Sequence, residues 1–133
     1  MRRVLVVEDD PQNALVFRMV LERRGGLTVT VSESAPEVLS LVRAGEVDLV
    51  IMDVSLADTH LEGKPVSGVD LCRLLKADPR TAGVPILLAT AHAMRGDAGS
   101  LIRESGADGY LSKPILDHDA FIFQVRSLFR EAA

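Results

Sequence analysis

Charged and hydroxyl side chains follow several short apolar runs of this 133-residue chain, each at the point where the run ends. Glu8 and Asp9 follow the first run, and Asp53 follows the third. Thr90 and Lys113 follow two later runs. If these runs are parallel strands, the side chains meet at the carboxyl edge of one sheet, where open α/β sheets bind ligands. The sequence therefore predicts a site of three carboxylates, one hydroxyl and one ammonium group.

Three neighbouring carboxylates repel one another, by about 4 kcal/mol for each pair at about 4 Å and an effective dielectric constant near 20. Protonation of one acid would relieve this repulsion and would raise its pKa. A divalent cation would also relieve it, and oxygen ligands in an open, hydrated site suit Mg²⁺ or Mn²⁺. A carboxylate so placed can act as a nucleophile that accepts a phosphoryl group. The lysine would supply a second positive charge.

The elements that would position these side chains alternate between strands and helices. Continuous apolar runs are typical of strands buried on both faces of a parallel sheet. Asp10 and Pro11 favour a helix start, and the threonines of the second run indicate an edge strand. Five strands and five helices predict a flavodoxin-like α/β fold, a doubly wound parallel sheet with strand order 2-1-3-4-5. We expect the strands at 4–7, 27–31, 48–52, 84–89 and 108–112, and the helices at 11–24, from the capping box at 34–37 to Gly45, and at 68–77, 96–105 and 117–130.

Length and composition exclude several classes of protein. The chain suits one domain, and its 47% apolar and 26% charged residues are normal for a globular protein. A net charge of −4 offers no broad basic field, so we expect no direct nucleic-acid binding. Cys72 is the only cysteine, which excludes an intrachain disulfide and fits a reducing cytoplasm. The apolar run after the first residues is too short for a signal peptide or a membrane span, so we expect a cytoplasmic protein.

The ordered motifs resemble those of bacterial response-regulator receiver domains, the phospho-acceptor modules of two-component signal transduction. The run 90–97 is similar to stand-alone receivers of the cell-cycle type and to receivers of hybrid kinases. The resemblance covers essentially the whole chain, so we expect 1–133 to be one stand-alone receiver domain without an output domain. The matching stretches are Val7-Glu8-Asp9-Asp10, Met52-Asp53, Thr90-Ala91 and Tyr110-Leu111-Ser112-Lys113-Pro114.

This resemblance implies a role for each residue of the predicted site. Asp53 would be the phospho-acceptor that forms an aspartyl-phosphate. Glu8, Asp9 and Asp53 would hold Mg²⁺ together with the backbone carbonyl of Ser55. Lys113 would pair with the phosphate. Its bond to the following proline is expected to be cis, which X-Pro bonds permit.

The resemblance also implies a two-state switch. Thr90 would move toward the phosphate, and Tyr110 would change rotamer with it. Together they would reshape the face made by the fourth helix, the fifth strand and the fifth helix. Ser55 and His92 flank the path of the hydrolytic water in the family, so both are expected to tune the phosphate lifetime. Asp10 is expected to lie outside the metal site.

The partners implied by the resemblance are proteins. A histidine kinase or a histidine phosphotransfer protein would donate the phosphoryl group, and an unknown downstream protein would read the switch. Leu15 and Met19 of the first helix are candidates for an exposed docking patch. The last two helices could also pair in a homodimer. Such a receiver catalyses only its own phosphotransfer and dephosphorylation, so we do not expect an enzyme that acts on other substrates.

The segment 54–67 departs from the family pattern. It takes about twice the usual number of residues to reach Gly68, and the usual proline near the acceptor is missing. Insertions beside an active site are often functional. A lid, a contact specific to one kinase and a tolerated surface insertion are the three interpretations that the sequence leaves open.

Three other classes fit the motifs less well. A hydrolase with an aspartate nucleophile usually carries a second acid two residues after it, where Ser55 stands. A dinucleotide-binding domain needs a glycine-rich first turn, but Glu8-Asp9-Asp10-Pro11 would repel a pyrophosphate there. A pseudo-receiver used only for protein contact would not need the chemical residues that this chain retains.

Overall fold

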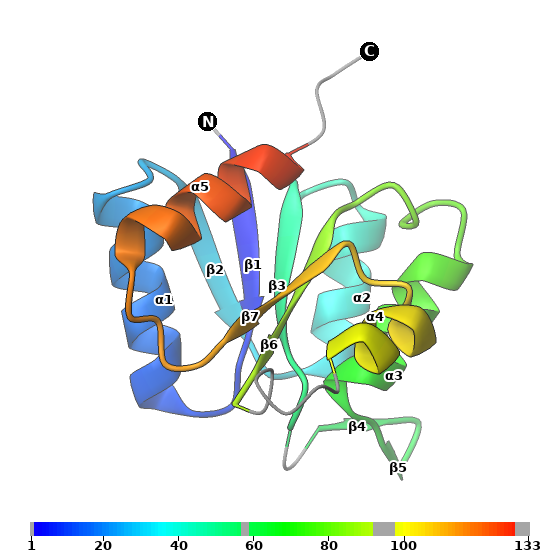
Figure 1. Cartoon of the computed structure of the whole chain (residues 1–133). Coiled ribbons are helices and arrows are strands. Elements are labelled where there is room, and N and C mark those ends of the chain that lie inside the picture. Colours follow the sequence, from blue (N-terminus) through cyan, green and yellow to red (C-terminus); the bar gives the residue numbers. More distant parts are fainter. Residues whose placement is uncertain (1, 57–58, 92–97, 130–133) are drawn as a thin grey trace.

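Five parallel strands form one sheet between two layers of helices (Figure 1). The computed structural model describes residues 2–56, 59–91 and 98–129. Its strand order, β2-β1-β3-β6-β7, is the predicted flavodoxin-like order, because β6 and β7 are the fourth and fifth strands of this sheet. The strands are β1 (Arg3–Val7), β2 (Thr28–Ser32), β3 (Leu49–Asp53), β6 (Ile86–Thr90) and β7 (Gly109–Ser112).

The two faces of the sheet are covered by different helices. In β1, Val4 and Val6 join an apolar cluster with α1 and α5, whereas Leu5 and Val7 join a second cluster with α2, α3 and α4. Successive side chains of a strand point to opposite faces, so a continuous apolar run serves both clusters. The helices are α1 (Pro11–Arg23), α2 (Ala35–Arg43), α3 (Gly68–Ala77), α4 (Ala98–Ser105) and α5 (His118–Leu128).

Capping side chains determine where the helices begin. Asp10 caps α1 by accepting a hydrogen bond from the backbone N–H of Gln12 at 2.9 Å, as predicted. Ser34 caps α2, and Ser67 forms a reciprocal capping box with Asp70 at the start of α3. α1 therefore begins four residues after the end of β1, whereas α3 begins fifteen residues after the end of β3.

Element bounds differ from the expected ones by one or two residues at most ends. β6 begins at Ile86 because the Val84 N–H donates to the Thr81 carbonyl in a turn. α5 ends at Leu128 because Phe129 has extended dihedral angles. The expected first two residues of the fourth helix, 96–97, lie outside the described residues.

A small hairpin in the segment after β3 was not predicted. β4 (His60–Leu61) and β5 (Lys64–Pro65) pair antiparallel, and Figure 1 shows them at the end of the molecule where β3 ends. Sequence reasoning found only a long polar stretch there, because two-residue strands carry no measurable periodicity.

Burial separates the core side chains of α1 from the two docking-patch candidates on the same helix. Phe17 and Val20 lie in the core, and Leu15 and Met19 on α1 are 57% and 39% exposed. Cys72 is fully buried, and this burial raises the pKa of its thiol to about 11, as expected for a packed, unreactive side chain. In the part of the chain that is described, no helix is long and apolar enough to cross a membrane.

Candidate functional site

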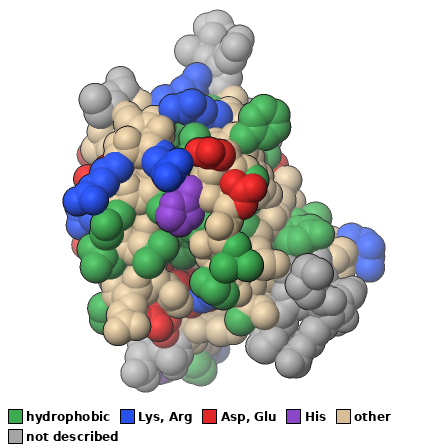
Figure 2. Space-filling model, turned by 60° about the vertical axis from the view of Figure 1, so that its left-hand side comes forward, with side chains coloured by type: hydrophobic (Ala, Val, Ile, Leu, Met, Phe, Trp, Pro, Cys, Tyr) green, Lys and Arg blue, Asp and Glu red, His purple; other side chains and the backbone are tan. Residues whose placement is uncertain are grey.

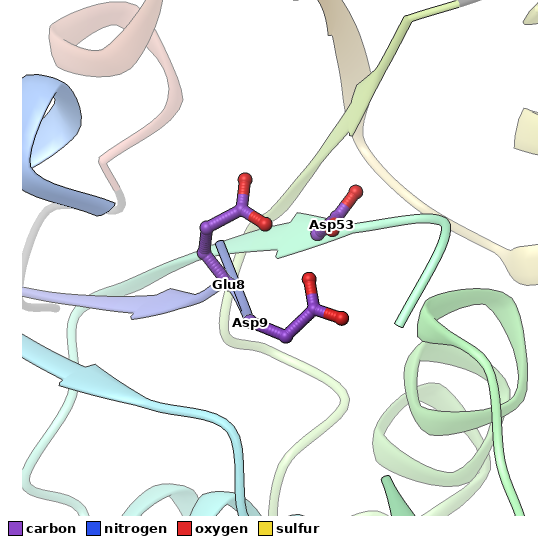
Figure 3. A group of neighbouring side chains, drawn as sticks. All are labelled: Glu8, Asp9 and Asp53. Carbon is purple, nitrogen blue, oxygen red and sulfur yellow. The ribbon is translucent and has the colours of Figure 1, made fainter. Parts of the chain in front are cut away.

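The candidate site lies at the carboxyl edge of the sheet, as predicted. Asp53 is the last residue of β3, and Glu8 and Asp9 directly follow β1, its neighbour in the sheet. One carboxylate oxygen from each acid lies within 4.8 Å of the other two. Figure 3 shows the three carboxylates turned toward one shared space. At such separations each pair of charges repels by about 3 kcal/mol or more at an effective dielectric constant near 20.

Lys113 binds two of the three acids. Its Nζ atom lies 3.1 Å from Glu8 Oε1 and 3.0 Å from Asp53 Oδ1. The Glu8 and Asp53 side chains are only 1% and 3% exposed, so these ion pairs are largely shielded from water. One ammonium group cannot balance three carboxylates. The described cluster therefore retains a negative charge that a further cation could neutralise.

The pKa values of Glu8 and Lys113 are both raised in this cluster. Burial, followed by the hydrogen bond with Asp53, raises the pKa of Glu8 to about 7, although Lys113 opposes the change. Burial lowers the pKa of Lys113, but the hydrogen bonds with Asp53 and Glu8 outweigh it, so that pKa lies above its usual range. Near neutral pH a proton and a metal ion would thus compete for Glu8.

A pH dependence of stability follows from the raised pKa of Glu8. The folded state binds a proton more tightly than the unfolded chain, so metal-free stability falls as pH rises from about 4.5 to about 7. We expect wild type to lose about 3 kcal/mol more than Glu8→Gln across this window. Urea unfolding at pH 5 and pH 8 in chelator measures the difference. Glu62 is an exposed acid outside the cluster, so Glu62→Gln should keep the wild-type change of unfolding free energy between pH 5 and pH 8. An equal change in wild type and in Glu8→Gln would contradict the interpretation.

The carboxyl end of β3, which carries Asp53, is held by hydrogen bonds from two backbone N–H groups. The Ser55 N–H donates to Asp53 Oδ1 at 3.2 Å, and the Val54 N–H donates to the Ala89 carbonyl at 3.0 Å. A Cβ atom on Gly68 would lie 1.8 Å from the Asp53 carbonyl oxygen. Only glycine fits this position, a requirement that sequence reasoning missed, although the glycine itself was noted as the end of the insertion.

Asp10 lies outside the acid cluster, as expected. Its carboxylate caps α1, and its backbone N–H donates to Glu8 Oε2 at 3.3 Å. Asp10 thereby supports the orientation of Glu8 from the helix side.

The residues expected to form the switch are at the predicted strand positions. Thr90 ends β6 and is 4% exposed, and its carbonyl accepts the Lys113 N–H at 2.9 Å. Tyr110 on β7 is opposite Leu88 in the strand register and is 43% exposed. Thr90 and Leu88 are two residues apart and share the α4 side of the sheet. The Lys113–Pro114 bond is cis, as expected. His92 lies outside the described residues.

The donor atoms suit a hard divalent cation. The described cluster offers only carboxylate oxygens, and Ser55, whose carbonyl was the fourth expected ligand, is exposed two residues after Asp53. Oxygen ligands of this kind favour Mg²⁺ or Mn²⁺ over the softer metals that cysteine or histidine would select.

The fold and the site together define a doubly wound α/β domain with an acid cluster and a lysine at its switch point. Comparison with known proteins agrees with this class: the model of the response regulator receiver domain matches residues 4–125. The chain therefore belongs to the response-regulator receiver domain family, and it is a response regulator of two-component signal transduction.

Relatives of similar length share its sequence and its structure. The polar-differentiation response regulator DivK of Brucella ovis is 34% identical over 131 residues, which cover 98% of each chain. A sensor protein from Polaromonas sp. JS666 has 28% identity and a TM-score of 0.79, covering 96% of this chain and 94% of that one. The receiver domain of sensor histidine kinase PA1611 from Pseudomonas aeruginosa has 27% identity, a TM-score of 0.75 and coverage of 96% and 93%, with a magnesium ion coordinated in its active-site cleft.

Proposed function

We propose that this chain is a stand-alone receiver that accepts a phosphoryl group on Asp53 from a histidine kinase or a histidine phosphotransfer protein. The observation that carries the proposal is the placement of Asp53, which ends β3 beside Glu8 and Asp9 and contacts the ammonium group of Lys113. A buried carboxylate that contacts an ammonium group and lies beside two further acids can act as a nucleophile toward a phosphoryl group.

The transfer step needs little movement of the protein. Asp53 Oδ1 already accepts hydrogen bonds from Lys113 Nζ and from the Ser55 N–H, so we assign the attack to Oδ2. The new bond joins Oδ2 to phosphorus, and the bond from phosphorus to the donor's imidazole nitrogen breaks, with its electron pair left on nitrogen. Lys113 would then move its ammonium group toward a phosphoryl oxygen. Hydrolysis by water later returns the carboxylate and inorganic phosphate.

Mg²⁺ is the cofactor that we propose, with Mn²⁺ as an alternative, held by Glu8, Asp9, Asp53 and the Ser55 carbonyl. When bound, it would neutralise charge on the phosphoryl oxygens during transfer. The magnesium ion in the receiver domain of PA1611 supports this choice.

The switch that we propose uses Thr90 and Tyr110. A hydrogen bond from the Thr90 hydroxyl to the phosphoryl group would favour an inward Tyr110 and would alter the α4–β7–α5 face. Two large apolar side chains beside this face, Leu116 and Phe123, are 91% and 76% exposed. A downstream protein or a second copy of the chain would cover them in the phosphorylated state.

Intact mass spectrometry tests the proposed chemistry. Incubation with Mg²⁺ and acetyl phosphate is expected to add the mass of one phosphoryl group to the wild type. The adduct should be lost in Asp53→Asn and in chelator, and it should persist in Asp10→Asn, whose side chain caps α1 outside the cluster. An adduct of equal yield in Asp53→Asn would exclude Asp53 as the acceptor.

We also propose that the protein donor docks beside Lys113. A hollow of about 350 Å³ lies between α1 and the segment that joins β7 to α5, and Lys113 lines one side of it. Its apolar residues include Val16, Met19 and Ile115. Figure 2 shows hydrophobic side chains gathered on this face. An amphipathic helix carrying the phosphohistidine would fit such a groove.

Met19→Glu is therefore expected to slow transfer from a phosphotransfer protein about tenfold or more, since a charge would be buried in the contact. Phosphorylation by acetyl phosphate should stay unchanged, because that donor needs no groove. Leu74→Glu on α3 is the matched control, since Leu74 is 43% exposed on the other face of the sheet. Equal slowing by the two variants, or slowing with acetyl phosphate, would contradict docking at α1.

A further inference from the structure

The described residues of the inserted segment, 54–56 and 59–67, include a hairpin and contacts with the rest of the domain. Its hairpin pairs His60 with Pro65 and Leu61 with Lys64 around Glu62-Gly63, whose φ angles are both positive at 54° and 80°. Positive φ at both central residues is typical of two-residue hairpin turns. Four apolar residues of the segment pack against the core cluster on the α2–α3 side of the sheet: Val54, Leu56, Leu61 and Val66.

Thr59 attaches this segment to a different part of the chain. It is 4% exposed, and its hydroxyl donates to the Glu33 carbonyl at 3.1 Å. Its own carbonyl accepts the Val66 N–H at 2.9 Å, which closes the base of the hairpin. The partly buried hydrogen bond from Thr59 to Glu33 joins residues 26 positions apart, so it restricts the position of the segment relative to a distant part of the chain.

The partner of Thr59 belongs to the connection between β2 and α2, which also holds Glu8. The Glu8 N–H donates to the Ser32 carbonyl at 3.3 Å, and the Ser34 N–H donates to Ser32 Oγ at 3.1 Å. The stretch 32–34, which consists of the last residue of β2 and the two residues before α2, is thus bonded to the acid that follows β1 on one side and to the segment that follows Asp53 on the other.

We propose that Thr59 is a positioning residue of the cation site. Through Glu33 and Ser32 it fixes the segment after Asp53 relative to the Glu8 end of β1, and so holds the carboxylates at the spacing that binds a divalent cation. The inference deepens the proposed function and rests on it only for the identity of the cation.

Electrostatics explains why such an attachment is needed. Before a cation binds, the three acids repel one another, and the ammonium group of Lys113 contacts Glu8 and Asp53. Repulsion would widen the site unless the segments behind the carboxylates were fixed. A site already fixed at the right spacing binds its ion more tightly, because little order is lost on binding.

Calorimetric titration of the intact protein with Mg²⁺ tests the proposal. Thr59→Val keeps the shape of the side chain but removes the hydroxyl, and we expect it to weaken Mg²⁺ binding about tenfold, the lower end of the range for residues that support metal ligands. Thr59→Ser keeps the hydroxyl and should bind Mg²⁺ nearly as the wild type does.

Thr81→Val is the matched control. Thr81 is 1% exposed, and its hydroxyl also donates to a backbone carbonyl, that of Leu75. It follows α3 and precedes β6, at the opposite edge of the sheet from the acids. We expect a fall in Tm similar to that of Thr59→Val, with Mg²⁺ affinity unchanged.

Two outcomes would overturn the role of Thr59: wild-type Mg²⁺ affinity in Thr59→Val, or equal weakening in Thr81→Val. The proposed function fails in a different way. A wild-type protein that binds Mg²⁺ but gains no phosphoryl group from acetyl phosphate would exclude the phospho-acceptor, whereas weakened Mg²⁺ binding in Thr59→Val would still support the positioning role.

Discussion

Lys113→Met is expected to abolish detectable phosphorylation and to make the stability of the protein depend on Mg²⁺. The wild-type ammonium group contacts Glu8 and Asp53, both almost fully buried. Without it, the metal-free protein loses the ammonium group that pairs with these two buried acids, which should lower the free energy of unfolding by about 3 kcal/mol. We propose that this ammonium group stabilises the transferring phosphoryl charge, so its loss should slow phosphorylation at least about 100-fold.

The same substitution should strengthen Mg²⁺ binding. A fixed positive charge beside the carboxylates opposes a second cation, so its removal is expected to raise Mg²⁺ affinity about tenfold or more. Urea unfolding with and without Mg²⁺ measures both effects, and Mg²⁺ should restore more stability to the variant than to the wild type.

Lys76→Met separates this effect from simple loss of an ion pair. Lys76 lies 2.8 Å from Asp108 and donates to the carbonyls of Ala82 and Val84, away from the acid cluster. The Lys76→Met protein should therefore have a lower free energy of unfolding than the wild type, and Mg²⁺ should not restore it. A Lys113→Met protein whose free energy of unfolding does not depend on Mg²⁺ would contradict the electrostatic interpretation of the site.

Gly68→Ala is expected to have the second large effect, through the backbone of the acceptor. The added methyl group would lie 1.8 Å from the Asp53 carbonyl oxygen and 2.7 Å from its carbonyl carbon, so either β3 or the start of α3 must move. We expect the free energy of unfolding to fall by about 3 kcal/mol or more. We also expect at least about 100-fold slower phosphorylation, because a shift of about 1 Å in a reacting group costs that much.

Gly83→Ala controls for the general effect of replacing a glycine. A methyl group there would meet nothing within 4 Å, so stability and phosphorylation rate should both remain close to wild type. Chemical unfolding and the rate of adduct formation with acetyl phosphate distinguish the two variants. A Gly68→Ala protein with wild-type rate and stability would show that the acceptor strand tolerates displacement.

Most of the fold could be predicted because the strands that carry the site are continuous apolar runs. Each buried strand ends where a polar residue appears, and this places Glu8, Asp53 and Lys113 at one edge once the strand order is known. Caps such as Asp10 mark the helix starts with equally local signals. Residues whose roles follow from strand ends were therefore found from the sequence.

Roles that depend on contacts between distant segments were not found. The double pairing of Lys113 with Glu8 and Asp53, rather than with a phosphate alone, depends on side-chain geometry across three strands. The bond from Thr59 to Glu33 joins two loops, and an isolated buried threonine has no sequence signature. The hairpin turn contains Glu62 at the position where asparagine is the usual signal, so the sequence did not indicate a two-residue hairpin turn there.

The contacts of the insertion argue against one of the interpretations that the sequence left open, the tolerated surface insertion. Its apolar residues and Thr59 join the core and the β2–α2 connection, which a tolerated surface insertion would not require. Support of the acid cluster is the role that best fits these contacts. The exposed tip at Glu62-Gly63 is still free to meet a kinase at the same time.

The position of the phosphoryl group tests the central claim most directly. Borohydride reduces an aspartyl-phosphate to homoserine, so protein treated with acetyl phosphate and Mg²⁺, then reduced and digested, reports the modified residue by peptide mass spectrometry. We expect homoserine at position 53 and unmodified Glu8 and Asp9. Reduction at another acid, or at none while the intact protein carries a phosphoryl group, would contradict the assignment of Asp53 as the acceptor.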